Sequence, residues 1–471
     1  MSVKFFPPKL LFAVVFLAAC GGCRSTPPGG DLPALEDMNV LLIVVDTMGA
    51  GHVGCLNPGL DTTPRIDELA KSGVRFTRAF SAAPWTQPSM SALMTGTTPS
   101  RTGVLHLFDS LPPRNVTLAE RFRERGLATA GVVSHFLIDA KLGFNQGFDS
   151  YDESAVVNHH RAISSPKVYQ AATADLDRLQ DQHFFMFVHF FDPHSHYLHH
   201  PEFDRTAWYH GPVRNWDLKI TELRKRLDEL DEDGTRYLRD LYREEIAFTD
   251  HNIGMLLDHL DELGLRDNTL VILTADHGEE FMEHRWIGHT RNLFDTLLHV
   301  PLIVSLPGRL APAEVDDPVS LLDIAPTLMG LSHTPVTDFR WDGVSLAGAL
   351  QGHEEYPSDR VLFHEVAYPA NKDEAGTPVA GRGTFLSAVT QGKWKLIHDV
   401  EHDQWSLFDR AADPGEYRDL WTREGPEVRT LQERLLGWET GKVEHWGVGK
   451  PLDKRLDKDL EKRLRSLGYI R

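Results

Sequence analysis

NVLLIVVD, residues 39–46, is an apolar run that an aspartate closes. Such a run predicts a strand that is buried on both faces, as in a parallel sheet covered by helices. The pattern recurs in FFMFVHFFD (184–192) and in TLVILTAD (269–276). Because ligands bind outside the carboxyl ends of parallel strands, three aspartates in this position predict one site at a sheet edge.

The segments between these runs have the features of helices and of further strands. Residues 64–73 begin with Pro and end with Gly, and residues 237–263 carry apolar side chains on one side of a long helix. A helix at 117–125 and strands at 128–133 and 301–306 continue the alternation. The alternation predicts an α/β fold with a mostly parallel sheet sandwiched by helices.

The pattern changes after residue 332. Residues 388–397 and 405–409 are typical of antiparallel strands, and residues 427–438 are typical of a helix. We therefore predict a catalytic domain at 38–332 and a smaller C-terminal α+β subdomain, an antiparallel sheet plus a helix with a charged tail, at 333–471.

The N-terminus has the features of an export signal. Two lysines precede an apolar stretch at 10–19, which is too short to span a bilayer. Cys20 follows, and this order resembles the lipobox of bacterial lipoproteins, which implies a signal peptide at 1–19 and a lipid on Cys20. The alternative is a plain secretory signal that is cut near Ala19.

Residues 20–37 are rich in Gly and Pro and predict a flexible tether. Gly21 after Cys20 resembles the lipoprotein sorting signals for the outer membrane. We therefore expect an exported protein that is lipid-anchored in a bacterial membrane, the outer membrane, facing the periplasm or the cell surface.

The composition of the chain limits which classes of partner it can bind. The chain has 471 residues, of which 41% are hydrophobic, so it can form a large globular core. Its formal net charge is −19, which argues against nucleic acid, because binding a polyanion requires many Lys and Arg side chains. With only three Cys, it has no disulfide framework.

The strand-end aspartates are Asp46, Asp192 and Asp276, and His277 follows the last of them. Asp and His are the side chains that hold Zn, Mn or Mg. For one such aspartate, a turn or a helix cap is an equal alternative. For three of them with histidines nearby, a metal site is the better interpretation.

Thr86 is the candidate nucleophile. It precedes a short helical stretch at 90–94, so one alternative is that it only caps this helix. A hydroxyl at a helix N-terminus is also well placed for anion chemistry, because the free N–H groups and the helix dipole favour negative charge there. A bound metal would lower the pKa of this hydroxyl.

The chain resembles the sulfatase family of the alkaline phosphatase superfamily. The resemblance is carried by motifs in the family's order and spacing, namely NVLLIVVDT, TPRIDELAKSGVRFTRAFS, PWTQPSMSALMTGTTPSRTGV, GFNQGFDSYD, FFDPHSHY, DNTLVILTADHGEEFMEH, GHTRNLFDTLLHVPLIV, VSLLDIAPTLMGL, WDGVSL, GKWKLIHD and LFDRAADPGEYRDL. They span nearly all of residues 39–421. The family implies an alkaline-phosphatase-like fold and a metal-dependent ester hydrolase.

One motif departs from the family. Sulfatases carry Cys or Ser in C/S-x-P-x-R, which is oxidised to formylglycine, whereas this chain has Thr86, Pro88 and Met90. Thr is a secondary alcohol, so its two-electron oxidation would give a ketone and no aldehyde. We therefore expect no formylglycine. A Thr nucleophile is similar to the phosphodiesterases and phosphoethanolamine transferases of the superfamily.

The resemblance also implies the metal ligands. A first site takes Asp46, Asp276 and His277, completed by Thr86. A second site, as in two-metal members of the superfamily, would take the residues Asp192, His196 and His289. In a competing assignment, His194 is the substrate-binding histidine that sulfatases carry in this motif. The cofactors would be divalent ions, Zn, Mn, Mg or Ca.

These observations predict a hydrolase that cleaves a small anionic phosphate or sulfate ester through a covalent Thr86 intermediate, with phosphate favoured. The alternatives are a sulfatase that works without formylglycine, a phosphoethanolamine-type transferase and a non-catalytic binding protein. The partners are the ester and, through the lipid, the membrane.

Overall fold

The computed structural model describes residues 32–443 apart from 108, 158–161, 335, 337–338, 368–384, 401 and 423–424, with only the backbone at 441–443. The predicted lipid site Cys20, the signal peptide and most of the tether lie outside these residues. Within the described residues, no helix is long and apolar enough to cross a membrane.

Three strands at the centre of the large sheet position the site. They are β1 (Asn39–Val45), β5 (Phe184–Phe190) and β6 (Thr269–Ala275), and all their residues are buried. β1 pairs in parallel with both neighbours, so that Val45 lies opposite Phe190 and Ala275. The segments that follow the three strands therefore begin side by side, as the sequence predicts.

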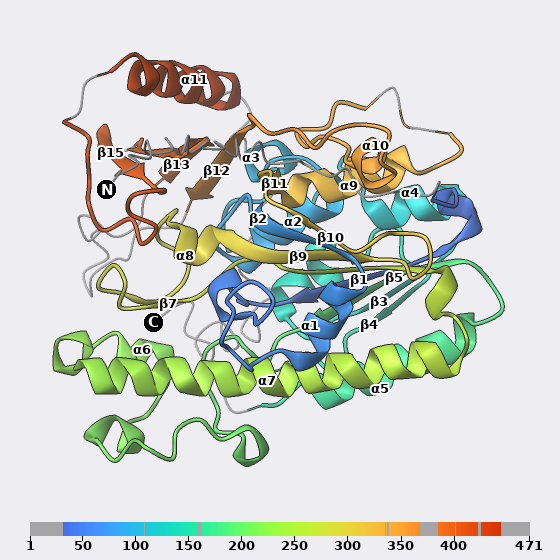
Figure 1. The fold of residues 1–471 in the computed structure, drawn as a ribbon, viewed down its shortest axis with the longest axis horizontal. Coiled ribbons are helices and arrows are strands. Elements are labelled where there is room, and N and C mark those ends of the chain that lie inside the picture. Colours follow the sequence, from blue (N-terminus) through green and yellow to red (C-terminus); the bar gives the residue numbers. More distant parts are fainter. Residues whose placement is uncertain are drawn as a thin grey trace, which may run out of the picture.

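The whole sheet has the order β10-β2-β9-β6-β1-β5-β3-β4, with β11 paired to β2 (Figure 1). The other strands are β2 (Val74–Phe80), β3 (Ala128–Val132), β4 (Ser150–Asp152), β9 (His299–Ser305), β10 (Ala313–Val315) and β11 (Val319–Ser320). β9 runs antiparallel to its neighbours β2 and β6, and the other pairs are parallel. This is the predicted mostly parallel sheet.

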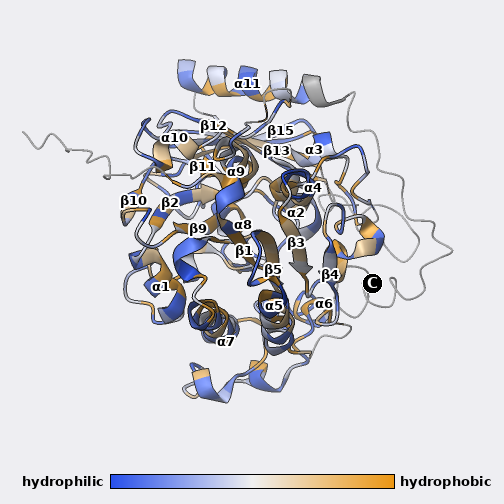
Figure 2. Cartoon of the chain, turned by 90° about the vertical axis from the view of Figure 1, so that its right-hand side faces the viewer, coloured by the Kyte–Doolittle hydropathy of each residue, from blue (hydrophilic) through white to orange (hydrophobic). Residues whose placement is uncertain are grey.

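Helices cover both faces of the sheet (Figures 1 and 2). One face carries α1 (Pro64–Lys71), α5 (Ser165–Leu179) and α7 (Glu232–Glu262), and the other carries α2 (Thr86–Thr95), α4 (Leu118–Glu124) and α9 (Ile324–Gly330). The long helix α7 begins before the predicted Tyr237, because the side chain of Asp231 caps it through the N–H of Gly234.

The C-terminal part is an antiparallel sheet with one helix, as predicted. The sheet has the order β12 (Val361–Ala367), β13 (Phe385–Gln391), β14 (Trp394–Asp399) and β15 (Gln404–Asp409), and α11 (Pro426–Val443) packs against it (Figure 1). The shorter elements are α3 (Pro99–Thr102), α6 (Ile220–Leu223), α8 (Asp295–Leu298), α10 (Ala347–Leu350), β7 (Glu280–Phe281) and β8 (Ile287–Gly288).

This small sheet packs against the loops of the site. Leu362, Ile397 and Phe408 from the sheet share one buried cluster with Trp85 and Phe191, which adjoin Thr86 and Asp192. The C-terminal subdomain therefore supports the loops that carry the candidate nucleophile.

Candidate active site

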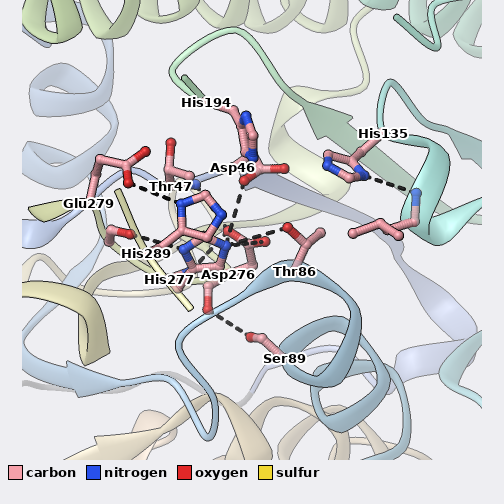
Figure 3. Close-up of polar contacts among 12 residues, drawn as sticks. Asp46, Thr47, Thr86, Ser89, His135, His194, Asp276, His277, Glu279 and His289 are labelled. Atoms are coloured by element: carbon pink, nitrogen blue, oxygen red, sulfur yellow. Dashed lines mark hydrogen bonds and ion pairs between the residues drawn. The ribbon is translucent and has the colours of Figure 1, made fainter. Parts of the chain in front are cut away.

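The predicted first set of residues converges at the ends of β1 and β6 (Figure 3). The Nε2 atom of His277 lies 3.4 Å from Oγ1 of Thr86. The same nitrogen lies 3.7 Å from Oδ1 of Asp46 and 3.4 Å from Oδ2 of Asp276. All four side chains are buried. Segments far apart in the sequence thus bring one hydroxyl, two carboxylates and one imidazole together.

The start of α2 places Thr86. Trp85 occupies the cap position and Thr86 the first helical position, and no side chain caps this helix. The alternative that Thr86 only caps the helix is therefore wrong. Ser89, one turn further along, donates a 2.7 Å hydrogen bond to the carbonyl oxygen of Asp276 and so ties α2 to the end of β6. The hydroxyl of Thr86 faces His277 at the positive end of the helix dipole.

Thr47 directly follows Asp46 and holds it beside Asp276 through the backbone. Its N–H donates to Oδ1 of Asp276 (3.1 Å), and its carbonyl accepts from the hydroxyl of Tyr242 on α7 (2.5 Å). The same hydroxyl accepts from the N–H of Gly49 (3.1 Å). Thr47 has a φ of 58°, which is strained for a β-branched residue. Strain of this kind persists where the surroundings enforce it and is typical of functional sites.

The aspartates carry unsatisfied oxygen atoms. Among the described residues, neither oxygen of Asp46 nor Oδ2 of Asp276 accepts a hydrogen bond within normal geometry. Burial, and then the neighbouring carboxylates of Asp276 and Glu279, raise the pKa of Asp46 well above its usual range. Burial also raises the pKa of Asp276. Buried carboxylates without partners are costly unless a cation lies between them.

A divalent cation fits this donor set. Asp46, His189 and Asp276 each offer a ligand atom, and these atoms lie within 4.8 Å of one another. The Nδ1 atom of His277 donates to the carbonyl of Gly278 (2.9 Å), which leaves the lone pair of Nε2 for a metal. The oxygens that lack hydrogen bonds are therefore those that a cation would take.

Two histidines of the site were missed by the sequence analysis. His189, within β5, lies 3.7 Å from Oδ2 of Asp46, and burial lowers its pKa to about 3. His135 follows β3 and accepts from the N–H of Leu137 (2.9 Å), and its ring lies 5.5 Å from that of His194. The signal for His189 is a lone polar residue in an apolar strand, and for His135 a histidine shortly after a strand end.

His194 and His289 line the site beside His277. The Nδ1 atom of His194 donates to the carbonyl of Ser195 (2.9 Å), and its ring lies 4.9 Å from the ring of His289. The Nδ1 atom of His289 lies 3.0 Å from Oε1 of Glu279. Burial lowers the pKa of both histidines well below the usual range. Both imidazoles are thus neutral, and they lie beside His277 at the reacting centre.

Glu279 is a further residue of the site that the sequence analysis did not single out. Burial raises the pKa of its carboxyl to about 8, although His277 and Arg224 act in the opposite direction. Its contact with His289 fixes the orientation of that ring. Its sequence signal is its place two residues after His277, on the loop that leaves β6.

The predicted second metal set is not assembled in this form. Asp192 accepts from the N–H and hydroxyl of Ser164 and from the N–H of Ser165, so both its oxygens hold the start of α5. His196 is buried, and His289 pairs with Glu279. Asp192 therefore holds this helix start, and the second metal site stays a prediction from the resemblance.

A second group of side chains of metal-ligand type lies where the loop before α7 meets that helix. It comprises His199 and Asp204 of the loop and Glu244 of α7. The oxygens of Glu244 accept from the N–H groups of His200 and Arg205. Oδ1 of Asp204 accepts from the N–H of Thr206 and of Ala207. Glu244 therefore holds the loop to α7, and Asp204 stabilises a turn within the loop.

Comparisons with known proteins identify the family of the chain. The sulfatase family model matches residues 38–334, and a model for the C-terminal part of N-sulphoglucosamine sulphohydrolase matches residues 282–438. Human (Homo sapiens) arylsulfatase A is 27% identical over 87% of this chain and 81% of its own length. The choline-sulfatase of Rhizobium meliloti (strain 1021) is 26% identical over 87% of each.

Solved structures have the same fold. The phosphonate monoester hydrolase of Agrobacterium radiobacter matches with a TM-score of 0.68 and 21% identity, covering 87% of this chain and 96% of that one. A 2-O GAG sulfatase matches with a TM-score of 0.68 and 22% identity, covering 91% of this chain and 96% of that one.

Proposed function

This chain belongs to the sulfatase family of metal-dependent ester hydrolases, and we propose that it cleaves a phosphate ester, a diester in particular, through a covalent intermediate on Thr86. The observation that carries the proposal is the contact between Oγ1 of Thr86 and Nε2 of His277 beside two aspartates with unsatisfied oxygens. The membership itself makes the protein an ester hydrolase.

Residue 86 favours phosphate over sulfate. A threonine cannot become formylglycine, and Met90 replaces the arginine of the family motif. The covalent ester on Thr86 must therefore be released by attack of water on its central atom. Phosphorus accepts such in-line attack in two-step hydrolases, so a phosphate ester fits the residues present.

The charge of the site favours a monoanion. Asp46, Asp276, His277 and Thr86, with His189 as a further candidate, would hold a divalent cation, which when bound lowers the pKa of the Thr86 hydroxyl and offsets the two carboxylates. With these charges balanced, a phosphate diester fits better than a doubly charged monoester. A sulfate monoester is also a monoanion and is the second candidate, supported by the sulfatase relatives.

The side chains supply the rest of the reaction. Thr86 Oγ1 forms the bond to phosphorus as the bond to the leaving oxygen breaks. We assign the transfer of its proton to that oxygen to one of the neutral imidazoles beside His277, His194 or His289. Water then attacks the phosphorus, and the bond to Thr86 breaks. The proton of the water restores the threonine hydroxyl.

A substrate panel tests this proposal. The soluble protein is assayed on bis-nitrophenyl phosphate, nitrophenyl phosphate and nitrophenyl sulfate, and its metal content is measured. We expect the diester to have the highest kcat/KM and one divalent ion per chain. A higher kcat/KM for the sulfate would contradict the phosphate preference and favour a sulfatase without formylglycine.

We also propose that the protein is exported and anchored in the outer membrane by a lipid on Cys20, on the lipobox-like order of residues 10–20. Labelling of cells with a fatty acid, followed by fractionation, tests this. Cys20→Ala should abolish both the label and the membrane association. A labelled Cys20→Ala protein would refute the lipidation site.

A further inference from the structure

Two arginines stack on one indole ring at the edge of the site. Trp286 lies between β7 and β8, and the guanidinium carbons of Arg224 and Arg291 lie 4.8 and 4.4 Å from the centre of its ring. All three side chains are partly exposed. Although the chain has a net charge of −19, Arg224 and Arg291 place two positive charges beside the site.

Backbone contacts fix the position of Arg224, which directly follows α6. Its Nε donates to the carbonyl of Ile287 (2.9 Å). A Cβ atom at Gly288 would collide with Nη2 of Arg224, so the guanidinium lies directly over this glycine. The next residue is His289, which lines the site. Stacking on an indole keeps the planar guanidinium oriented without removing its charge.

Arg224 lies beside the site on the side away from Thr86. His289 stands between Arg224 and the reacting centre, since its ring lies 4.6 Å from that of His277, which contacts Thr86. One side chain, that of His289, thus lies between the guanidinium of Arg224 and the position of the reacting ester.

We propose that Arg224 and Arg291 form a subsite for a second oxyanion, which the leaving alcohol of the substrate carries. The substrates are then esters of alcohols that bear their own carboxylate, sulfate or phosphate group. A guanidinium presents parallel N–H donors to such a group and binds it more tightly than a neutral one. This inference rests on the proposed function, because it names the substrate class of the same site.

A matched pair of esters tests the subsite. Both are methyl phosphate diesters, one with 4-hydroxybenzoate as leaving group and the other with its methyl ester, so that they differ in one remote charge. We expect a lower KM for the charged ester. Arg224→Met should raise the ratio of the charged to the neutral KM by about tenfold, the size of one charge-assisted hydrogen bond, and Arg224→Lys should recover part of it.

Arg226 provides a matched control. It stacks on Trp216 at 3.6 Å and pairs with Glu229, so Arg226→Met removes an equivalent cation nearby. The KM ratio should keep its wild-type value in this variant. An equal effect of Arg224→Met on both esters, or a tenfold change in Arg226→Met, would overturn the subsite.

A binding measurement separates this inference from the proposed function. If the wild-type protein hydrolyses neither ester, the proposed function fails, and calorimetry with benzene-1,3-dicarboxylate and benzoate still tests the subsite. The dicarboxylate should bind more tightly than benzoate to the wild type, and Arg224→Met should remove this difference. Equal affinities in the wild type would refute the subsite.

Discussion

Nε2 of His277 lies 3.4 Å from Oγ1 of Thr86, although 191 residues separate them in the sequence. Both side chains are fully buried, so the contact is made inside the protein where water does not weaken it. His277 is oriented by the carbonyl of Gly278, and Thr86 by the start of α2. The parallel pairing of β1 and β6 makes this relationship possible.

Thr86→Val should lower kcat/KM by at least about a thousandfold, because the variant keeps the shape of threonine but has no nucleophile. Metal content and the midpoint of thermal unfolding should stay close to the wild-type values. Thr86→Ser, which restores a hydroxyl, is the control and should recover measurable turnover. Activity in Thr86→Val above about a tenth of the wild type would refute the nucleophile.

Asp46→Asn should stabilise the protein without metal and destabilise it relative to the wild type with metal. Burial and two nearby carboxylates raise the pKa of Asp46, so the folded metal-free protein loses stability as the pH rises above the usual range of a carboxyl. The amide removes this cost, on the order of 1–2 kcal/mol, together with a ligand. Denaturation at pH 7 with chelator and with Zn²⁺ measures both changes; the same ranking under both conditions would contradict the metal site.

Most of the fold follows from the sequence, because β1, β5 and β6 are short, mainly apolar runs, and such runs of about seven residues favour buried strands. The position of the aspartates in the site follows from the sequence as well, because each of them directly or closely follows the end of one of these strands. The role of Asp192 does not follow, because its partners, Ser164 and Ser165, are set by the docking of α5. This helix is not among the elements that the sequence predicts.

The histidines show the same limit. His189 occupies an interior position of β5, and which strand lies beside it decides whether it meets Asp46 or only core side chains. Glu279 was not singled out because its partner His289 comes from the segment after β8. Sequence spacing reports the ends of elements well, but it does not report which side chains from different elements will meet.

Lys395→Met should destabilise the protein by about 3–5 kcal/mol, because it leaves buried carboxylates without their cation. Lys395 is fully buried on β14, and its ammonium group contacts the carboxylates of Asp295 (2.5 Å) and Glu416 (2.7 Å). Burial alone would raise the pKa of Asp295, but Lys395 and Arg410 outweigh burial and lower it. Chemical denaturation of the full chain measures the change in the free energy of unfolding.

Lys393→Met is the matched control for that variant. Lys393 pairs with Asp409 at 2.7 Å, but its side chain is 47% exposed. Exposed ion pairs contribute about 1 kcal/mol or less, so this substitution should have little effect. Similar losses of unfolding free energy in both variants would contradict a special contribution from the buried cluster of Lys395, Asp295 and Glu416, which joins the C-terminal sheet to the catalytic domain.

The stability contributed by His200 and Glu245 should fall as the pH rises from about 5 to 8. Burial raises the pKa of Glu245 to about 7, and the bond to Glu245 (2.8 Å) outweighs burial and raises the pKa of His200. Both groups hold more protons folded than unfolded, so the free energy of unfolding decreases with pH. Glu245→Gln should reduce this slope, by on the order of 1–2 kcal/mol over the window. An unchanged slope would contradict the assignment.

Tyr242→Phe should lower kcat more than it changes KM. The hydroxyl of Tyr242 donates to the carbonyl of Thr47 and accepts from Gly49, and Thr47 in turn donates to Asp276. Without this hydroxyl, the hydrogen bond from α7 to the strained Thr47 (φ 58°) is lost, so the two aspartates lose their common position while the walls of the pocket remain. We expect a loss of about tenfold to a hundredfold in kcat and a weaker affinity for the metal, as for other supports of metal ligands.

Tyr237→Phe, on the same helix but stacked on Tyr209 away from Thr47, is the control and should keep wild-type kinetics. A Tyr242→Phe enzyme with normal kcat and normal metal affinity would show that the strand end holds Thr47 unaided.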